Sequence, residues 1–317
     1  MDSIDQAIAK SVRYLGSQAA RQSIAQDHYW PKWDSPWWHM LLLHEMGETR
    51  RIPQSIVEKM IRALGESPVK IFPYQDSDIP RGMLIARTHC HCSMGSIYQV
   101  LSAWGVDVDT ELPWIRPWFL RYQLPDGGLT CDNGAYLIKD DCPSSMVGTI
   151  SPFEAILLYA KQPWTAEEQS FVDRAAGFLI QRQLVLGSRS KHNQEEQLQE
   201  ANWLKLCFPR FYFYDILRGL NALLIWSEKT GRALSKDTIA PAFQSLATRF
   251  PDGKVIKERE SFAGRQTLAF ENGHWVHPRP AARFALLDAT SRVGEESIYL
   301  SRQWAGCRAR AERLGLA

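Results

Sequence analysis

The helical spacing of the apolar residues is the feature of this sequence that most constrains its fold. Apolar residues recur at i, i+4, i+7 and i+11 between Phe213 and Leu224, and at i, i+3, i+4 and i+7 between Val172 and Leu179. This spacing puts the apolar side chains on one face of a helix. Runs of alternating β-branched residues, which are typical of strands, are absent from the sequence. The sequence therefore predicts an all-α protein.

Two types of helix alternate along the chain. One type is mostly apolar, and the other ends in a basic or Gln-containing stretch that is often followed by a turn. The apolar type covers residues 36–47, 92–105, 151–161, 213–226 and 281–294, and the second type covers residues 7–18, 113–129, 172–188 and 239–255. We predict that the apolar helices line the inside and that the others wrap around them. About five or six such pairs would form a closed (α/α) toroid, with an open helical solenoid as the alternative.

The composition limits the classes of function. Of the 317 residues, 45% are hydrophobic and 23% are charged, and the net charge of +2 gives no general attraction to nucleic acid or to an anionic membrane. No apolar run is long enough for a membrane span, and the N-terminus lacks the pattern of an export signal. We therefore expect one domain over residues 1–317 in the cytoplasm, with reduced cysteines.

One stretch carries a family resemblance. The segment "FLRYQLPDGGLTC" (119–131) resembles the outer-helix-and-turn repeat of squalene and oxidosqualene cyclases, and Gln123–Gly128 carry the match. Leu129 stands where an aromatic residue usually follows. The stretches "WPKWDSPWWHMLLLHEMG", "CSMG", "CDNG", "DDC" and "FPRFYFYDILRGL" resemble bacterial prenyltransferase-like and squalene-cyclase-like proteins. The resemblance implies an (α/α) toroid, a fold that the β-subunits of protein prenyltransferases also have.

The acidic motifs of these relatives are incomplete here. Class II terpene cyclases use an Asp-x-Asp-Asp motif, and the nearest stretch, "DVDT" (107–110), lacks the third acid. The Asp-Asp-x-x-Asp motif that holds magnesium and diphosphate fails after Asp140 and Asp141. Protein prenyltransferases hold zinc with an Asp-x-Cys pair and a distant His. Asp140, Cys142 and His277 have that order, although a proline follows the cysteine.

The thiols suggest a metal site. The segment "RTHCHCSMG" (87–95) places two Cys and two His where a helix is expected to begin. In a helix that starts at Thr88, Cys90 and Cys92 would lie about 200° apart around the axis, so only Cys92 would face the site. The repeat would bring the loop before the next inner helix close to Cys92. The predicted zinc ligands are Cys92, Cys131 and Cys142, completed by His91, His89 or Asp141, with an open position for water or a substrate thiol.

Two other interpretations of these residues stay open. The cysteines are also typical of buried, unligated core residues, and a Cys–His pair could act as a nucleophile. Outside this group, we expect Cys207 to pack in the core and Cys307 to lie on the surface of the last outer helix.

Further candidate residues lie at the expected starts of inner helices. Aromatic side chains there would suit isoprenoid chains or sugars equally well. Paired carboxylates would suit glycoside cleavage. The candidate catalytic residues are Asp34, His39, Asp141 and Asp215, and the candidate cavity residues are Trp37, Trp38, Tyr212, Tyr214 and His277.

We therefore predict a terpene-cyclase-like or prenyltransferase-like enzyme that acts on an apolar or isoprenoid-like small molecule in a central cavity, assisted by zinc. The alternatives are a carbohydrate-active hydrolase or lyase and a non-catalytic binding toroid. The sequence does not indicate a protein partner.

Overall fold

A computed structural model describes residues 3–67, 69, 90–132, 135–136, 138–262, 266–271 and 274–316, without the side chains of residues 277 and 278. This part of the chain is mostly helical, as predicted. The helices are α1 (Ile4–Leu15), α2 (Gln18–Gln26), α3 (Pro36–Glu45), η1 (Thr49–Arg51), α4 (Gln54–Glu66), α5 (His91–Trp104), α6 (Val108–Glu111), α7 (Ile115–Tyr122), α8 (Met146–Tyr159), α9 (Ala166–Gln181), η5 (Gln194–Gln199), α10 (Glu200–Leu204), α11 (Ile216–Thr230), α12 (Lys236–Arg249), α13 (Ala285–Thr290) and α14 (Ile298–Arg313).

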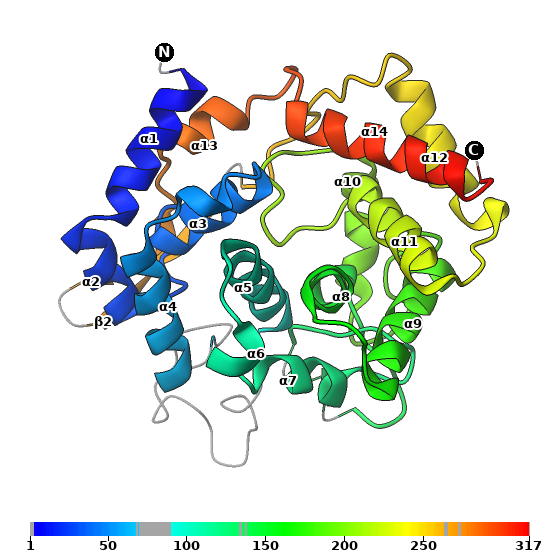
Figure 1. Cartoon of the computed structure of the whole chain (residues 1–317), viewed down its shortest axis with the longest axis horizontal. Helices are drawn as coiled ribbons and strands as arrows, with labels where there is room; N and C mark the ends of the chain where they lie inside the picture. The colour runs from blue at the N-terminus through cyan, green and yellow to red at the C-terminus, as the bar shows by residue number, and fades with distance from the viewer. Residues whose placement is uncertain are drawn as a thin grey trace.

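The predicted difference between inner and outer helices is visible in the burial. Every residue of α3 from Pro36 to Leu43 is buried, and α5, α8 and α11 are buried over most of their length. Helices α1, α4, α9 and α12 bury one face only. Figure 1 shows α3, α5, α8 and α11 toward the middle of the molecule and α1, α2, α4, α7 and α9 further out.

Helices α5 and α8 form the closest pair of inner helices, and a glycine makes this approach possible. A Cβ atom on Gly95 would collide with the backbone of Ser151 and Pro152. Any larger residue at position 95 would therefore force the two helices apart.

The motif that carries the family resemblance forms a turn that ties one outer helix to the next. Gln123, at the end of α7, donates its side-chain N–H to the backbone oxygens of Gly127 and Phe171, at 2.8 and 3.0 Å. Gly127 has a φ of +89°, which favours glycine. The Asp126 side chain accepts the Gly128 N–H at 3.1 Å. The turn therefore links α7 directly to α9.

Two expectations about the C-terminal part need correction. Strands β1 (Gln266–Glu271) and β2 (His274–Pro280) form an antiparallel hairpin in a segment for which no strand was predicted, a short exception in a fold that is otherwise helical as expected. The sequence "ENGH" between them carries Asn-Gly, which is a strong hairpin signal. The fifth apolar segment, 281–294, contains only the short helix α13, which packs against α1.

No helix in the described part of the chain is long and apolar enough to cross a membrane.

Candidate metal centre

Three thiols meet at the N-terminal end of α5. The Sγ atoms of Cys90 and Cys92 are 3.3 Å apart, and those of Cys90 and Cys131 are 3.9 Å apart. All three sulfur atoms lie within 4.8 Å of one another. Cys90 and Cys92 are buried, and Cys131 is half-buried. Among the described residues, these three make up the group of side chains that could hold a metal ion.

The place where α5 begins explains why Cys90 belongs to this group. The helix starts at His91, and Cys90 is its N-cap with an extended backbone, φ −72° and ψ 100°. The predicted angle of about 200° between Cys90 and Cys92 holds only inside a helix. Because Cys90 lies just outside the helix, its side chain turns toward Cys92. The expectation that Cys90 faces away from Cys92 was therefore wrong.

Cys131 reaches the group because the segment after α7 is held against α5. The ring Nδ1 of His91 is 2.7 Å from the backbone oxygen of Thr130, and the Cys92 backbone N–H donates to the Cys131 sulfur at 3.4 Å. Free N–H groups in the first turn of a helix favour negative charge nearby. The start of α5 is therefore suited to thiolate sulfur.

The electrostatics of the group concentrate negative charge on one sulfur. Hydrogen bonds with Cys131 and Cys92 hold the pKa of Cys90 well below its ordinary value. For Cys92, the hydrogen bond with Cys131 lowers the pKa, but the contact with Cys90 and burial outweigh it and raise the pKa. Contacts with Cys90 and Cys92 raise the pKa of Cys131 as well.

A half-buried lysine supplies positive charge to this region. Burial alone would lower the pKa of Lys32, but negative charge on Tyr212, Cys90 and Cys92 raises it above its ordinary value. Its Nζ atom lies 4.9 Å from the ring centroid of Trp30, and it donates to the Tyr212 hydroxyl at 3.5 Å. An ammonium group that sits among aromatic rings beside thiols is well placed to offset thiolate charge.

The three cysteines fit a zinc ion. Thiolate is a preferred ligand of zinc, and a Zn–S distance of about 2.3 Å at tetrahedral angles separates two sulfur atoms by about 3.8 Å. The sulfur separations of 3.3 and 3.9 Å bracket this value. Small side-chain rotations would therefore bring the three sulfur atoms to ligand distance.

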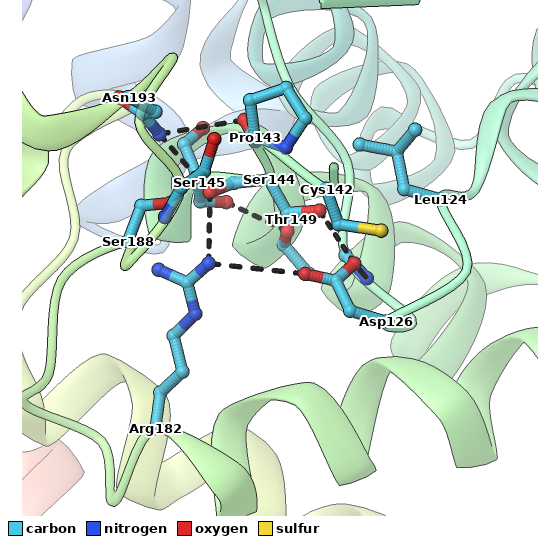
Figure 2. A network of polar contacts seen from close by, with 12 residues as sticks. Leu124, Asp126, Cys142, Pro143, Ser144, Ser145, Thr149, Arg182, Ser188 and Asn193 are labelled. Carbon is cyan, nitrogen blue, oxygen red and sulfur yellow. Dashed lines mark hydrogen bonds and ion pairs between the residues drawn. The ribbon is translucent and has the colours of Figure 1, made fainter. Parts of the chain in front are cut away.

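Cys142, a predicted ligand, lies elsewhere, and Cys90 takes its place in the cluster. Figure 2 shows Cys142 in a different polar network, beside Asp126. There the Ser144 hydroxyl donates to Asp126 at 2.6 Å, and Arg182 donates to the backbone oxygen of Ser144 at 3.0 Å. These bonds hold the segment before α8 toward α9. That position explains why Cys142 does not join the three thiols.

Two of the residues predicted to complete the site, His91 and Asp141, are not part of the thiol group. The ring of His91 faces the aromatic side chains of Phe119, Tyr122 and Tyr136. Burial lowers the pKa of His91 to about 4, and its Nε2 atom makes no hydrogen bond to any described residue. Asp141 accepts a hydrogen bond from the Ser190 hydroxyl at 2.5 Å. His89 lies outside the described residues.

Of the remaining candidate catalytic residues, Asp34 and His39 lie together, because the Asp34 backbone contacts the His39 ring, whereas Asp215 lies at the start of α11. Burial raises the pKa of Asp34 to about 6 and lowers that of His39 to about 3. His39 stacks on Phe284 with ring centroids 3.7 Å apart and contacts the Ser11 hydroxyl at 3.1 Å. Asp215 is the N-cap of α11, where it accepts the Arg218 backbone N–H. These contacts hold the side chains of Asp215 and His39 in place, and their catalytic role stays a prediction.

The predicted cavity residues divide into core residues and one residue near the thiols. Trp37, Trp38 and Tyr214 are at most 1% exposed. Trp38 donates to the backbone oxygen of Tyr29 at 3.2 Å, and Tyr214 donates to that of Leu184 at 2.8 Å. Tyr212 is half-buried beside Lys32. His277 falls on β2, and its side chain lies outside the described part.

Sequence reasoning missed four charged residues in the middle of the molecule. Glu45, Glu154, Arg210 and Arg218 line a cavity of about 220 Å³ between the inner helices. Three of them could have been found from the sequence, because each is a charged residue in an otherwise apolar helix or at its end. They are Glu45 in "LLLHEMG", Glu154 in "SPFEAILLY" and Arg218 in "DILRGL". A buried charge is costly unless a partner or a ligand compensates it.

No protein-family model, curated protein or solved structure matches the chain.

Proposed function

We propose that the protein is a zinc-thiolate enzyme in which Cys90, Cys92 and Cys131 hold the ion. The observation that carries the proposal is the approach of these three sulfur atoms to within 4.8 Å of one another. Three protein ligands leave one tetrahedral position for water or a substrate thiol, as in catalytic zinc sites. Bound there, zinc would lower the pKa of water or a thiol and so supply a nucleophile at neutral pH.

In this proposal the chain closes into an (α/α) toroid of the prenyltransferase-like type and acts in the cytoplasm. The buried helices α3, α5, α8 and α11 support that architecture, since helices that are apolar on all sides need a surrounding layer. The isoprenoid-like substrate stays a prediction. An apolar chain would suit the aromatic side chains around Lys32 better than the cavity between the inner helices, which has a polar lining.

Metal analysis of the purified protein tests the proposal. Protein prepared under reducing conditions should contain one zinc per chain, and Cys131→Ser should lose it. Cys207→Ser is the control, because Cys207 is a buried free thiol that lies outside the thiol group. Wild-type protein that contains no zinc and takes up none from added zinc salt would contradict the proposal.

A further inference from the structure

The cavity between the inner helices has the construction of a binding site. It is lined by residues of α3, α5, α8, α11 and α14 and of the segment before α11. Its volume of about 220 Å³ equals that of about seven water molecules in the liquid, at about 30 Å³ each. A molecule the size of a monosaccharide would fill it.

Most of the charge in the cavity wall is already paired. Arg218 donates through Nε and Nη2 to Glu154, with a shortest distance of 2.6 Å, through Nη2 to the Ser151 hydroxyl, and through Nη1 to the backbone oxygens of Phe211 and Phe213. All five N–H groups of its guanidinium are therefore committed. Arg210 donates to Asp215 and Gln303 at 3.2 and 2.7 Å.

The balance of charge disfavours an anionic ligand. Glu45 accepts the backbone N–H groups of Arg210 and Phe211 at 2.8 and 2.5 Å. Glu45, Glu154 and Asp215 together place three carboxyl groups in this region. The opposing positive charge comes from two guanidinium groups, those of Arg210 and Arg218. A phosphate or a carboxylate would find little uncommitted positive charge and would meet the carboxyl group of Glu45.

Several polar atoms of the wall remain available, and they are of both kinds. The amide oxygen of Gln303 accepts from Arg210 and that of Asn221 from Cys307, and neither NH₂ group has a partner among the described residues, so both can donate. Gln99 uses its NH₂ group for Ser151 and Glu154, which leaves its oxygen as an acceptor. The Tyr159 hydroxyl and the His44 Nε2 atom make no hydrogen bond within the described part of the chain, although His44 Nδ1 contacts Thr49.

We propose that this cavity binds a small, uncharged, hydroxyl-rich molecule of the size of a monosaccharide or cyclitol. A hydroxyl group both donates and accepts, so several hydroxyls can satisfy a wall that carries both donors and acceptors. An amine would leave the two NH₂ groups unpaired, and an apolar chain would leave all of the polar atoms unpaired, at a cost for each buried group. This proposal concerns a different part of the molecule from the zinc centre and does not depend on zinc binding.

The state of Glu45 agrees with an uncharged ligand. Burial raises the pKa of Glu45 to about 7, although the nearby Arg210 lowers it. Near neutral pH the carboxyl group can therefore donate to a hydroxyl oxygen or accept a hydroxyl proton. Burial also lowers the pKa of His44 to about 4, so its ring is neutral under the same conditions.

Calorimetric titration and thermal shift with a defined panel of compounds test the proposal. The panel contains D-glucose, D-mannose, D-galactose and myo-inositol, with inorganic phosphate, lysine and geraniol as the competing classes. At least one sugar or cyclitol should bind in a saturable manner and raise the Tm. Tyr159→Phe should weaken this binding about three- to tenfold, which is the effect of one neutral hydrogen bond.

Two further variants make the result decisive. Tyr98→Phe is the matched control, because the Tyr98 hydroxyl donates to Asp109 and not into the cavity, so it should leave binding unchanged. Asn221→Leu should abolish binding, because it removes a free donor from the cavity wall. Zinc content, measured in the same samples, should not change. Binding of geraniol or phosphate instead, no binding by any sugar or cyclitol, or an unchanged affinity in Tyr159→Phe would overturn the proposal.

Discussion

The sulfur atoms of Cys90 and Cys92 lie 3.3 Å apart because α5 begins between the two residues. Cys90 is still extended, whereas Cys92 is in the first turn, so the two side chains converge. The Ser93 hydroxyl donates to the Cys90 sulfur at 3.4 Å and helps to hold it in place. A shift of the helix start by one residue would separate the pair.

The first prediction concerns the stability that a bound metal provides. Zinc at a thousandfold excess over its dissociation constant should stabilise the folded protein by about 4 kcal/mol, provided that it binds the folded form alone. A chelator should therefore lower the Tm of the wild type, as measured by differential scanning calorimetry, and Cys90→Ser should lower it in the same way.

Cys142→Ser is the informative comparison for that prediction. The sequence alone assigned Cys142 to the metal and placed Cys90 on the other side of the helix, whereas in the structure Cys90 lies with Cys92 and Cys131, and Cys142 lies beside Asp126. Cys142→Ser should therefore keep the metal and the sensitivity to chelator. Loss of metal in Cys142→Ser together with its retention in Cys90→Ser would contradict the geometry described here.

The second prediction concerns the contact between α5 and α8. Gly95→Ala places a methyl group against the backbone of Ser151 and Pro152, which cannot move aside as a flexible side chain could. We expect a loss of about 1–3 kcal/mol in the free energy of unfolding, the usual effect of overpacking. Urea denaturation followed by circular dichroism measures this loss.

A second glycine provides the control for that measurement. Gly177 lies within α9, and no atom would come within 4 Å of an added Cβ. Gly177→Ala should therefore stabilise the protein by about 0.4–1 kcal/mol through helix propensity and the unfolded-state entropy. If both variants shift stability in the same direction, the close approach at Gly95 does not govern the packing of the two helices.

The third prediction concerns the buried ion pair in the cavity wall. Arg218 and Glu154 are 2.6 Å apart, and their side chains are each 8% exposed. Arg218→Met leaves the Glu154 carboxylate buried without its partner, so we expect a loss of about 3–5 kcal/mol. The double variant Arg218→Met/Glu154→Leu should recover part of this loss, because it removes the unpaired charge.

An exposed ion pair provides the reference value for this loss in unfolding free energy. Arg313 and Glu228 are also 2.6 Å apart, but their side chains are 57% and 36% exposed. Arg313→Met should cost at most about 1 kcal/mol, because solvent screens the pair. Equal losses for Arg218→Met and Arg313→Met in urea denaturation would show that the cavity wall is well hydrated.

The periodicity of the sequence predicted the helices well, because the spacing of apolar residues reflects whether a helix is buried on one face or on all sides. The segment 36–47 was expected to be an inner helix, and α3 is buried throughout its first eight residues. Cys307 shows the limit of this reasoning. It was expected at the surface of the last helix, but it is fully buried, with its sulfur 3.6 Å from Asn221 of α11.

The site was harder to predict because it depends on where elements end. Repeat spacing brought Cys92 and Cys131 together correctly in the prediction, since a loop that precedes one inner helix returns to the start of its neighbour. The direction of Cys90 depended on the exact first residue of α5, and helix boundaries are the least certain part of a prediction from sequence. The position of Cys142 depended on long-range bonds of the segment before α8. Glu45 and Arg210 meet across 165 residues, a contact that no local pattern encodes.

The last prediction concerns the acid sensitivity that a buried histidine causes. Burial lowers the pKa of His39 to about 3, against about 6.5 in the unfolded chain. The unfolded state therefore binds more protons below pH 6.5, so the contribution of His39 to stability is complete above that pH and is lost as the pH falls toward 3. At pH 4.5 the loss from this residue should be about 2–3 kcal/mol.

Glu45 acts in the opposite sense, because its raised pKa makes the folded state the better proton acceptor between about pH 4.3 and 7. The total pH curve thus combines both effects, and only a comparison of variants isolates His39. His39→Gln should flatten the decline in unfolding free energy between pH 6.5 and 4.5, while His192→Gln, at an exposed position, should leave it unchanged. A decline that is equally steep in His39→Gln and in the wild type would show that the ring of His39 gains a proton without unfolding the contact with Phe284 and Ser11.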